Sequence, residues 1–261
     1  MRKNLVLIKL GGSLITDKVK PFTPNMQHIK FLAEELRQAR DEFTEVDFLV
    51  GNGAGSYGHF PAHQYGLKNG ARTPEQLYGM CVTHNYVREL NDLVATELIS
   101  KKLPAFTISP SSIFMHHGGQ IASANLDPVD ELLSRHCIPV VYGDTICDDI
   151  LGTSIMSTEE VLHACMQPLR SGYAMVTVLY LLDSAGVLDD NGQVIPRLGA
   201  NDNVIERLHL EHDVTGGIMA KIASARKAAK MADVVYLADG REPGIIRRAI
   251  IGEDVGTKII V

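Results

Sequence analysis

The sequence predicts an α/β sandwich with a mostly parallel central sheet. Apolar strand-like runs alternate with helical segments along the chain, which is the order that builds parallel sheets covered by helices. The run over 175–182 is apolar without alternation, as expected for a strand buried on both faces. Glycines follow several of these runs, where strands give way to helices. No internal repeat or linker-like stretch divides the chain, so we expect a single domain over 1–261.

The first half of the chain begins with a predicted buried strand over 5–10. Thr23 and Pro24 predict the N-cap and first turn of a helix, whose apolar residues then recur at helical spacing. A short strand over 48–50 follows. The sequence Thr73-Pro74-Glu75-Gln76 is a capping box, which predicts the start of a long helix that reaches residue 98.

In the second half, a strand is predicted over 105–109, and Asp127-Pro128 predicts the start of another helix. The remaining elements are predicted from apolar runs and one Ala-rich stretch: strands over 139–142, 175–182, 234–237 and 259–261, and a helix over 216–231.

Composition and charge exclude several classes of function. Lys and Arg total 25 against 31 Asp and Glu, a net charge of −6, which argues against nucleic-acid and membrane-surface partners but not against a small anionic ligand. The longest uncharged hydrophobic run, 171–182, is too short for a membrane helix. The four cysteines show no zinc-site spacing, so we expect reduced thiols in a cytoplasmic protein.

Three strand-to-helix junctions are rich in glycine: Gly11-Gly12-Ser13, Gly53-Ala54-Gly55-Ser56-Tyr57-Gly58-His59 and Thr215-Gly216-Gly217. Ligands of open parallel sheets bind beyond the carboxyl ends of the strands. Glycines let the backbone approach a ligand closely, and successive N–H groups at a helix start can face an anion. One such turn is usually structural, but three together suggest a ligand with several phosphates.

The second junction fits the spacing G-x-G-x-x-G, yet we do not expect a dinucleotide-binding motif. His59-Phe60-Pro61 follows where that motif begins a helix, and Pro61 restricts the preceding residue. A Walker A sequence is also missing.

Three lysines and one histidine are candidate catalytic residues. Lys9 lies at the end of an apolar strand, an unusual place for a charge that serves only solvation. Lys221 lies four residues after Gly217, and Lys18 lies in the loop after the first glycine turn. His59 directly follows the second glycine loop. The alternative is that the lysines are ordinary solvent-facing charges and that the histidine is structural.

These junctions together resemble the amino acid kinase family. The matching residues are Ile8-Lys9-Leu10-Gly11-Gly12-Ser13-Leu14-Ile15-Thr16-Asp17-Lys18, the loop Gly53 to His59, Asp213-Val214-Thr215-Gly216-Gly217 with Lys221, and Gly256-Thr257. The resemblance runs essentially from end to end. The motif G-x-G-S-F/Y-G-H is its most specific part, because it looks like that of the members with a phosphate or phosphonate acceptor.

The resemblance implies an αβα sandwich that uses ATP with Mg²⁺ to phosphorylate a small-molecule monophosphate, isopentenyl phosphate above all. It places acceptor binding in about 1–150 and nucleotide binding in about 151–261, and it implies a homodimer. The implied catalytic residues are Lys9, Lys18, His59 and Lys221. The implied ATP-binding residues are Lys9, Gly11, Gly12, Ser13, Asp183, Gly186, Gly216, Gly217 and Lys221. The implied acceptor-binding residues are Ala54, Gly55, Ser56, Gly58, His59 and Gly152.

A short hydrocarbon tail on the acceptor needs an apolar pocket beside the phosphate. The helix after the capping box carries a stripe from Leu77 to Val87, of which we expect Met80 and His84 to line that pocket. The alternative is that the whole stripe belongs to the core.

The chain also departs from the family pattern. Ala185 replaces an acidic residue near the nucleotide, and Thr158-Glu159 replaces a Gly-Asp pair. Asn52 and Ala54 replace a frequent His and Gly. Two alternatives therefore stay open: a kinase with another phosphate or phosphonate acceptor, such as fosfomycin or a nucleoside monophosphate, or a non-catalytic protein that binds nucleotides or oxyanions. The metal contacts and the dimer interface are not predicted.

Overall fold

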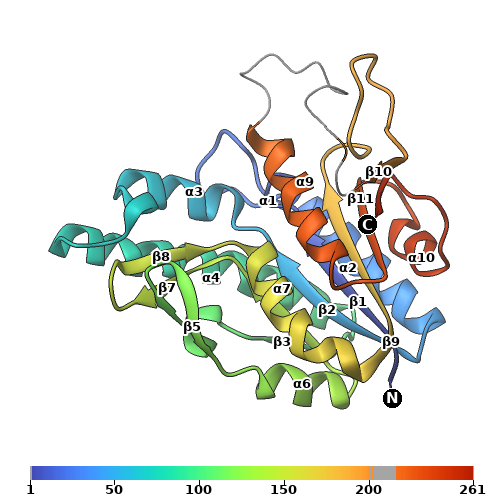
Figure 1. Ribbon diagram of the computed structural model, residues 1–261, viewed down its shortest axis with the longest axis horizontal. Helices are drawn as coiled ribbons and strands as arrows, with labels where there is room; N and C mark the ends of the chain where they lie inside the picture. Colours follow the sequence, from blue (N-terminus) through green and yellow to red (C-terminus); the bar gives the residue numbers. More distant parts are fainter. Residues whose placement is uncertain (1, 200–201, 203–215, 261) are drawn as a thin grey trace.

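The apolar runs of the sequence form an eight-stranded sheet at the centre of the computed structural model, which describes residues 2–199, 202 and 216–260 (Figure 1). Every pairing in this sheet is parallel except that of β11 with β12, so the prediction of a mostly parallel sheet is confirmed. The strands lie in the spatial order β10 (Arg197–Gly199), β12 (Thr257–Ile260), β11 (Val234–Asp239), β9 (Tyr173–Leu182), β1 (Arg2–Leu10), β2 (Val46–Asn52), β6 (Ile138–Tyr142) and β3 (Ala105–Thr107).

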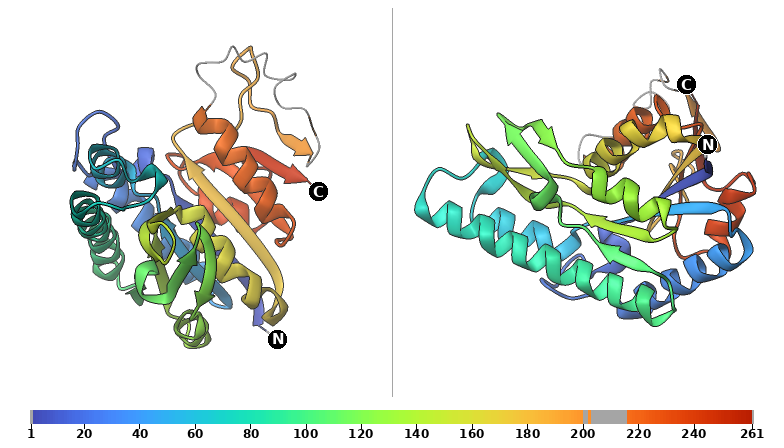
Figure 2. Two further views of the ribbon diagram at one scale, coloured as in Figure 1. Left: turned by 60° about the vertical axis from the view of Figure 1, so that its left-hand side comes forward. Right: turned by 90° about the horizontal axis from the view of Figure 1, so that it is seen from below.

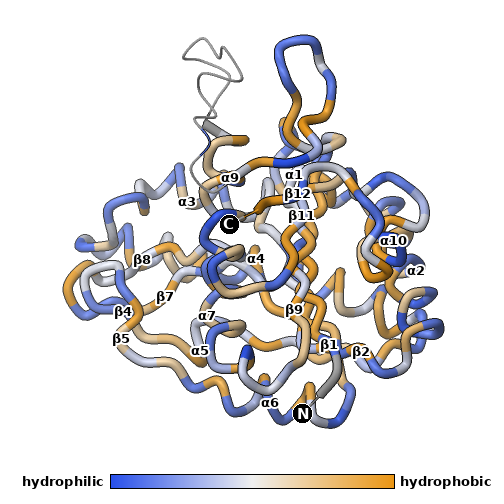
Figure 3. The backbone as a smooth tube through the Cα atoms, turned by 45° about the vertical axis from the view of Figure 1, so that its right-hand side comes forward, coloured by the Kyte–Doolittle hydropathy of each residue, from blue (hydrophilic) through white to orange (hydrophobic). Residues whose placement is uncertain are grey.

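Helices cover both faces of this sheet, as the sandwich prediction requires. One face packs against α2 (Met26–Glu42), α4 (Pro74–Ser100) and α10 (Ile245–Ile250). The other packs against α6 (Asp127–Ser134), α7 (Thr158–Leu169) and α9 (Gly216–Ala229). The hydropathy colouring in Figure 3 shows β9 and β11 as predominantly apolar between these two layers. Burial on both faces explains why their sequences do not alternate.

The alternation of β1 decides which face of the sheet its buried lysine, Lys9, lies on. Val6 and Ile8 face the layer of α2 and α10, whereas Leu5 and Leu7 face the layer of α7 and α9. Side chains two residues apart share a face of a strand, so Lys9 lies on the same side as Leu7, toward α7 and α9.

A second, four-stranded sheet was not predicted from the sequence. Its strands lie in the order β5 (Gln120–Ala124), β4 (Phe114–His117), β7 (Asp144–Asp148) and β8 (Gly152–Met156). The long helix α4 packs against β7, and Figure 2 (right) shows it running beneath this sheet. These strands are short and largely polar, which hides them in the hydropathy pattern.

Buried Asp148 organises the turns of the second sheet. Its carboxylate accepts hydrogen bonds from the N–H groups of Gly118, Gly119, Ile150 and Leu151, at 2.6 to 3.0 Å. Burial alone raises the pKa of this carboxyl, but the four N–H groups outweigh it and hold the pKa far below its usual range.

The remaining short elements are α1 (Gly12–Ile15), α3 (Gly55–Gln64), α5 (Pro110–Ile113) and the 3₁₀ turns η1 (Leu67–Asn69) and η2 (Arg170–Gly172). The second glycine loop leads into a helix, as a strand-to-helix junction should, and Pro61 does not prevent it, because α3 starts within the loop and runs through Pro61. Proline removes one intrahelical hydrogen bond, and α3 continues for only three residues beyond it.

Two helix starts test the capping predictions. The capping box of Thr73 and Gln76 is confirmed, with both reciprocal hydrogen bonds present at the start of α4. The start at Thr23-Pro24 is wrong, because α2 begins at Met26 and its N-cap is Asn25, whose side chain accepts from the N–H of His28. Pro24 instead forms a bridge with Thr16, which keeps it in the preceding loop. Among the described helices, none combines the length and the hydropathy needed to cross a bilayer.

Candidate active site

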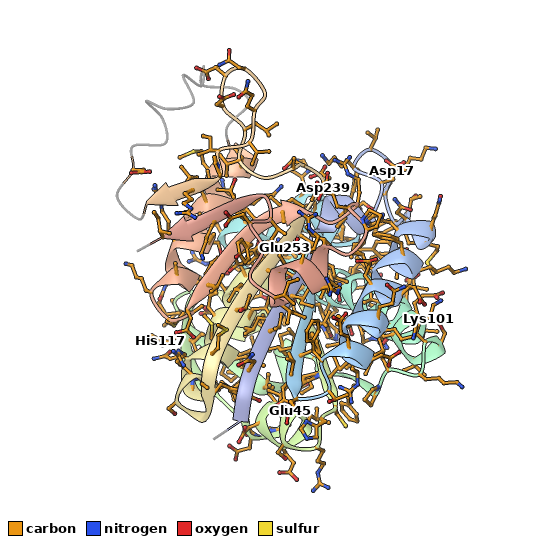
Figure 4. All side chains as sticks on the ribbon, turned by 90° about the vertical axis from the view of Figure 1, so that its right-hand side faces the viewer. Asp17, Glu45, Lys101, His117, Asp239 and Glu253 are labelled. Atoms are coloured by element: carbon orange, nitrogen blue, oxygen red, sulfur yellow. The ribbon has the colours of Figure 1, made fainter. Side chains whose placement is uncertain are left out.

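A cavity of about 560 Å³ lies at the carboxyl ends of β1, β2 and β6. Its lining includes the residues that follow each strand: Gly11 to Ser13 after β1, Gly53 to Ser56 after β2, and Gly143 to Thr145 after β6. Figure 4 labels Asp17 and Asp239 at this end of the molecule and Glu45, which precedes β2, at the other. Ligands are expected at this end of an open parallel sheet.

The first two glycine loops pack backbone against backbone, which is why both need glycine. A Cβ atom on Gly12 would lie 2.5 Å from the N atom of Gly55, and one on Gly53 would lie 2.6 Å from the N atom of Gly12. Thr16 links the loops further, because its Oγ1 donates to the carbonyl of Gly12 at 2.8 Å and accepts from the N–H of Ser56 at 3.1 Å. This packing brings the two loops to one cavity.

Some of the predicted backbone donors are already engaged. The N–H of Gly11 donates to the carbonyl of Leu181 at 3.0 Å, and the N–H of Gly58 donates to that of Ala54 at 3.3 Å. Gly12 and Ser13 open α1, and N–H groups at such a position lack an intrahelical acceptor. The geometry therefore favours Gly12 and Ser13 over Gly11 as anion donors.

Ser56 and His59 present side-chain donors on α3. They lie three residues apart, the spacing that puts two side chains on one side of a helix, and both line the cavity. Ser56 is buried, and its Oγ has no hydrogen-bond partner in the part of the chain that the structure describes. A buried hydroxyl without a partner is costly, and an anion would satisfy it.

The three predicted lysines come from elements other than α3, namely β1, the loop after α1, and α9, and each has a carboxylate nearby. Lys9, buried as the strand alternation requires, forms an ion pair with Glu159 at the start of α7. The Nζ of Lys18 lies 2.5 Å from Oδ2 of Asp183, and the Nζ of Lys221 lies 3.9 Å from its Oδ1. All three lysines line the cavity.

Burial and charge shift two of these groups. Burial lowers the pKa of Lys221 below its ordinary value, and nearby Asp183 only partly offsets this effect. Burial raises the pKa of Asp183, but the hydrogen bond and charge of Lys18, a hydrogen bond from Ser13 and the charge of Lys221 together outweigh it, so the pKa of Asp183 lies below its usual range.

Glu159 appeared in the sequence only as a departure from a family pattern, and its contact with Lys9 was missed. A signal for its position was present, since Ser157 and Glu160 form a capping box at the start of α7. One turn after Glu159, the Nε2 of His163 lies 2.7 Å from the hydroxyl of Tyr180 on β9. Tyr180 pairs in register with Lys9, so this contact ties α7 to the strand beside the lysine.

Several predicted residues lie outside the cavity lining. His84 and Met80 are both absent from the lining, although Nδ1 of His84 lies 3.0 Å from Oδ1 of Asp144, which lines the cavity. Gly152 packs against the carbonyl of Ala71, and Gly186 packs beneath Thr257. The apolar residues that do line the cavity include Phe60, Ala62, Val87, Ile155 and Met156.

The third glycine junction is described only in part. Asp213, Val214 and Thr215 lie outside the described residues. Gly216 is the first residue of α9, and Gly217 lines the cavity together with Lys221.

Comparison with known proteins matches residues 4–239 to the Amino acid kinase family. The chain is 30% identical to isopentenyl phosphate kinase of Methanocaldococcus jannaschii and 29% identical to that of Methanothermobacter thermautotrophicus; both matches cover 98% of each chain. An X-ray structure of isopentenyl phosphate kinase is 26% identical and matches with a TM-score of 0.79, covering 98% of this chain and 100% of that one. The αβα architecture described above is shared with that structure.

Proposed function

The chain belongs to the amino acid kinase family, and from that premise we propose that it transfers the γ-phosphoryl group of ATP to isopentenyl phosphate, giving isopentenyl diphosphate. The observation that carries this proposal is that one cavity is lined both by neutral hydrogen-bonding side chains and by three lysines. Ser56, whose Oγ has no partner among the described residues, and His59 form what we call the acceptor side, and Lys9, Lys18 and Lys221 form what we call the donor side. Full-length similarity to two isopentenyl phosphate kinases supports the choice of acceptor.

The acceptor side suits a monophosphate with a short apolar tail. The phosphate would accept from the hydroxyl of Ser56, from the ring of His59 and from the N–H of Gly55. Phe60, Val87 and Ile155 line the same cavity and would hold the hydrocarbon. A carboxylate acceptor would satisfy fewer of these donors, because it has fewer oxygens than a phosphate to accept their hydrogen bonds.

The reaction needs no general base, because the acceptor phosphate is already an anion. One of its oxygens forms a bond to the γ-phosphorus, and the bond from that phosphorus to the β–γ bridging oxygen breaks, which releases ADP. The obstacle is bringing two anions into line, so catalysis rests on positioning and on neutralising charge. Lys9, Lys18 and Lys221 would supply that neutralisation.

Mg²⁺ is part of this proposal as the partner of ATP. The described residues contain no group of three His, Cys, Asp or Glu side chains that could hold a metal ion. Mg²⁺ commonly binds through substrate phosphates, retained waters and at most one or two carboxylates. The triphosphate would therefore supply most of its ligands, with Glu159 or Asp183 as the protein carboxylates on that side. When bound, the ion neutralises phosphate charge.

We further infer a single-domain homodimer in the cytoplasm. Family resemblance supports the dimer, and the four cysteines, all free thiols, are consistent with a reducing compartment. Light scattering of the purified protein tests the dimer, since it separates a mass of about twice 28.5 kDa from a monomer.

The test of the proposed function is ADP release from Mg-ATP with a panel of acceptors. The panel contains isopentenyl phosphate, dimethylallyl phosphate, fosfomycin, UMP and N-acetylglutamate. We expect the highest kcat/KM with isopentenyl phosphate. Turnover of UMP or fosfomycin alone would replace the proposed acceptor, and ATP binding without turnover of any acceptor would favour a non-catalytic binding protein.

A further inference from the structure

The loop between α1 and α2 carries Lys18 to the cavity. Its two ends are tied together, because the N–H of Asp17 donates to the carbonyl of Thr23 at 2.9 Å and Thr16 forms a bridge with Pro24. The Oδ1 of Asp17 also accepts from the N–H groups of Val19 and Lys20, at 2.8 and 3.1 Å. Asp17 is labelled on this loop in Figure 4. The loop is thus a locally ordered turn.

One aromatic ring fastens this turn to the body of the molecule. Residues 18–21 are exposed, but Phe22 is half-buried. Its ring stacks on Tyr86 of α4, with centroids 3.9 Å apart and planes 18° apart, and it meets the edge of Tyr57 of α3 at 5.9 Å. Stacked and edge-to-face pairs of this kind are favourable beyond the area that they bury.

The backbone at Phe22 is unfavourable by itself. Its φ is +50°, in the left-handed region that residues with a Cβ atom seldom adopt. Such a conformation persists only where surrounding contacts hold it, and strained backbone of this kind gathers at functional sites. The contacts around it are the ring contacts with Tyr57 and Tyr86 and the hydrogen bond from the N–H of Asp17 to the carbonyl of Thr23.

We propose that Phe22 is a positioning residue, which holds the 17–24 loop so that Lys18 reaches the donor phosphates. The side chain of Lys18 is 63% exposed, and its contact on the body is Asp183, a carboxylate that it shares with Lys221. Without the ring, the loop would keep its internal turn but lose its orientation. Tyr57 belongs to α3, which also carries Ser56 and His59. The ring of Phe22 therefore fixes the position of Lys18 relative to the residues that would bind the acceptor phosphate. The inference rests on the proposed function for its kinetic consequence.

A double-mutant cycle separates positioning from simple packing. Phe22→Gly removes the ring and relieves the backbone strain, and Lys18→Ala removes the positioned group. Mg-ATP affinity by calorimetry and kcat with isopentenyl phosphate are measured for both single variants and the double variant. We expect Phe22→Gly to lower kcat about tenfold and to weaken Mg-ATP binding, and to change each less than about twofold when Lys18 is already alanine. Phe22→Tyr, which keeps a stacking ring, should retain most of the activity.

The matched control is Phe43→Ala, which removes a half-buried ring at the end of α2. It should lower the melting temperature and leave kcat unchanged. Trypsin cleavage after Lys18 should accelerate at least severalfold in Phe22→Gly and not in Phe43→Ala. Equal losses from Phe22→Gly in both Lys18 backgrounds, or unchanged cleavage, would overturn the proposal. A wild type that binds Mg-ATP but turns over no acceptor contradicts the proposed function alone, because the affinity cycle still decides on Phe22.

Discussion

The two sides of the cavity differ in how their polar groups are satisfied. On the acceptor side, Ser56 Oγ is buried without a partner among the described residues, and His59 is exposed to the cavity. On the donor side, Lys9, Lys18 and Lys221 each already face a carboxylate. On the acceptor side, a bound phosphate would give the Ser56 hydroxyl its hydrogen-bond partner. On the donor side, each lysine must turn from its carboxylate partner to a phosphate of ATP. Mutations on the two sides should accordingly have different signatures.

The largest effect is expected from Lys9→Met. This change removes a cation from the donor phosphates and leaves Glu159 facing them without its partner, so we expect kcat/KM for ATP to fall about 10²- to 10³-fold. Steady-state kinetics with varied Mg-ATP measure this. The double variant with Glu159→Gln should regain part of the ATP affinity. A double variant no better than Lys9→Met would remove the stranded carboxylate from the explanation.

His59→Ala should act on the other substrate. Losing a donor to an anionic phosphate costs about 1.5 to 3 kcal/mol, so kcat/KM for the acceptor should fall about 10- to 10²-fold. The dissociation constant of Mg-ATP should change less than twofold. His59→Gln, which keeps an N–H donor, is the matched variant and should be less impaired. Collapse of ATP affinity with intact acceptor affinity would mean that the second glycine loop serves the donor.

Ser56→Ala should weaken acceptor binding and spare stability. The loss of one donor to the anionic phosphate predicts a rise of about tenfold in the KM of the acceptor, at the low end of the range expected for His59→Ala. The melting temperature without ligand should stay the same or rise, because the change deletes a buried hydroxyl that has no partner. Thermal unfolding and kinetics on the same preparation measure both. A clear loss of stability would show that Ser56 is a structural residue.

The smallest expected effect is on the free energy of unfolding and comes from His84, whose buried partner Asp144 lines the cavity. The hydrogen bond that Nδ1 of His84 donates to the carboxylate of Asp144 raises the pKa of His84 above 6.5, and burial only partly opposes this. The resulting stability is therefore fully present below pH 6.5 and is lost as the pH rises through the folded pKa.

Urea unfolding of wild type and His84→Asn checks this sign. Because His84 is one-third exposed, we expect the wild type to lead by no more than about 1 kcal/mol at pH 5.5, and the lead to shrink at pH 9. A lead that grows with pH would reverse the assignment and make His84 a neutral buried residue.

The sequence predicted the parts of the fold whose signals are local. The apolar runs of β1 and β9 and the capping box at Thr73 are recognisable within a few residues. Where a local signal had two meanings, tertiary contacts decided: Pro24 is a common helix starter, but its bridge to Thr16 moved the start of α2 to Met26. The second sheet depends on the contacts of Asp148 with distant turns, which no local pattern reveals.

In the candidate site too, residues with a local motif were predicted, and contacts that depend on tertiary packing were not. Lys9, Lys18, Lys221, Ser56 and His59 were all found from motifs, and the structure brings them to one cavity. Asp183 was also predicted, but the ion pairs of the lysines were not, and Glu159 is 150 residues from Lys9 and meets it only once α7 packs on β1. The tail pocket was assigned to Met80 and His84 from helical spacing alone, whereas the cavity is lined one turn further along α4, at Thr83 and Val87.

The central claim is that the γ-phosphoryl group passes directly to the phosphate of isopentenyl phosphate. Phosphorus NMR of a reaction with Mg-ATP and isopentenyl phosphate tests it most directly. We predict that the signal of the monophosphate is replaced by the paired signals of a diphosphate, with one ADP formed for each. Formation of ADP with inorganic phosphate while the isopentenyl phosphate signal stays unchanged would contradict the account.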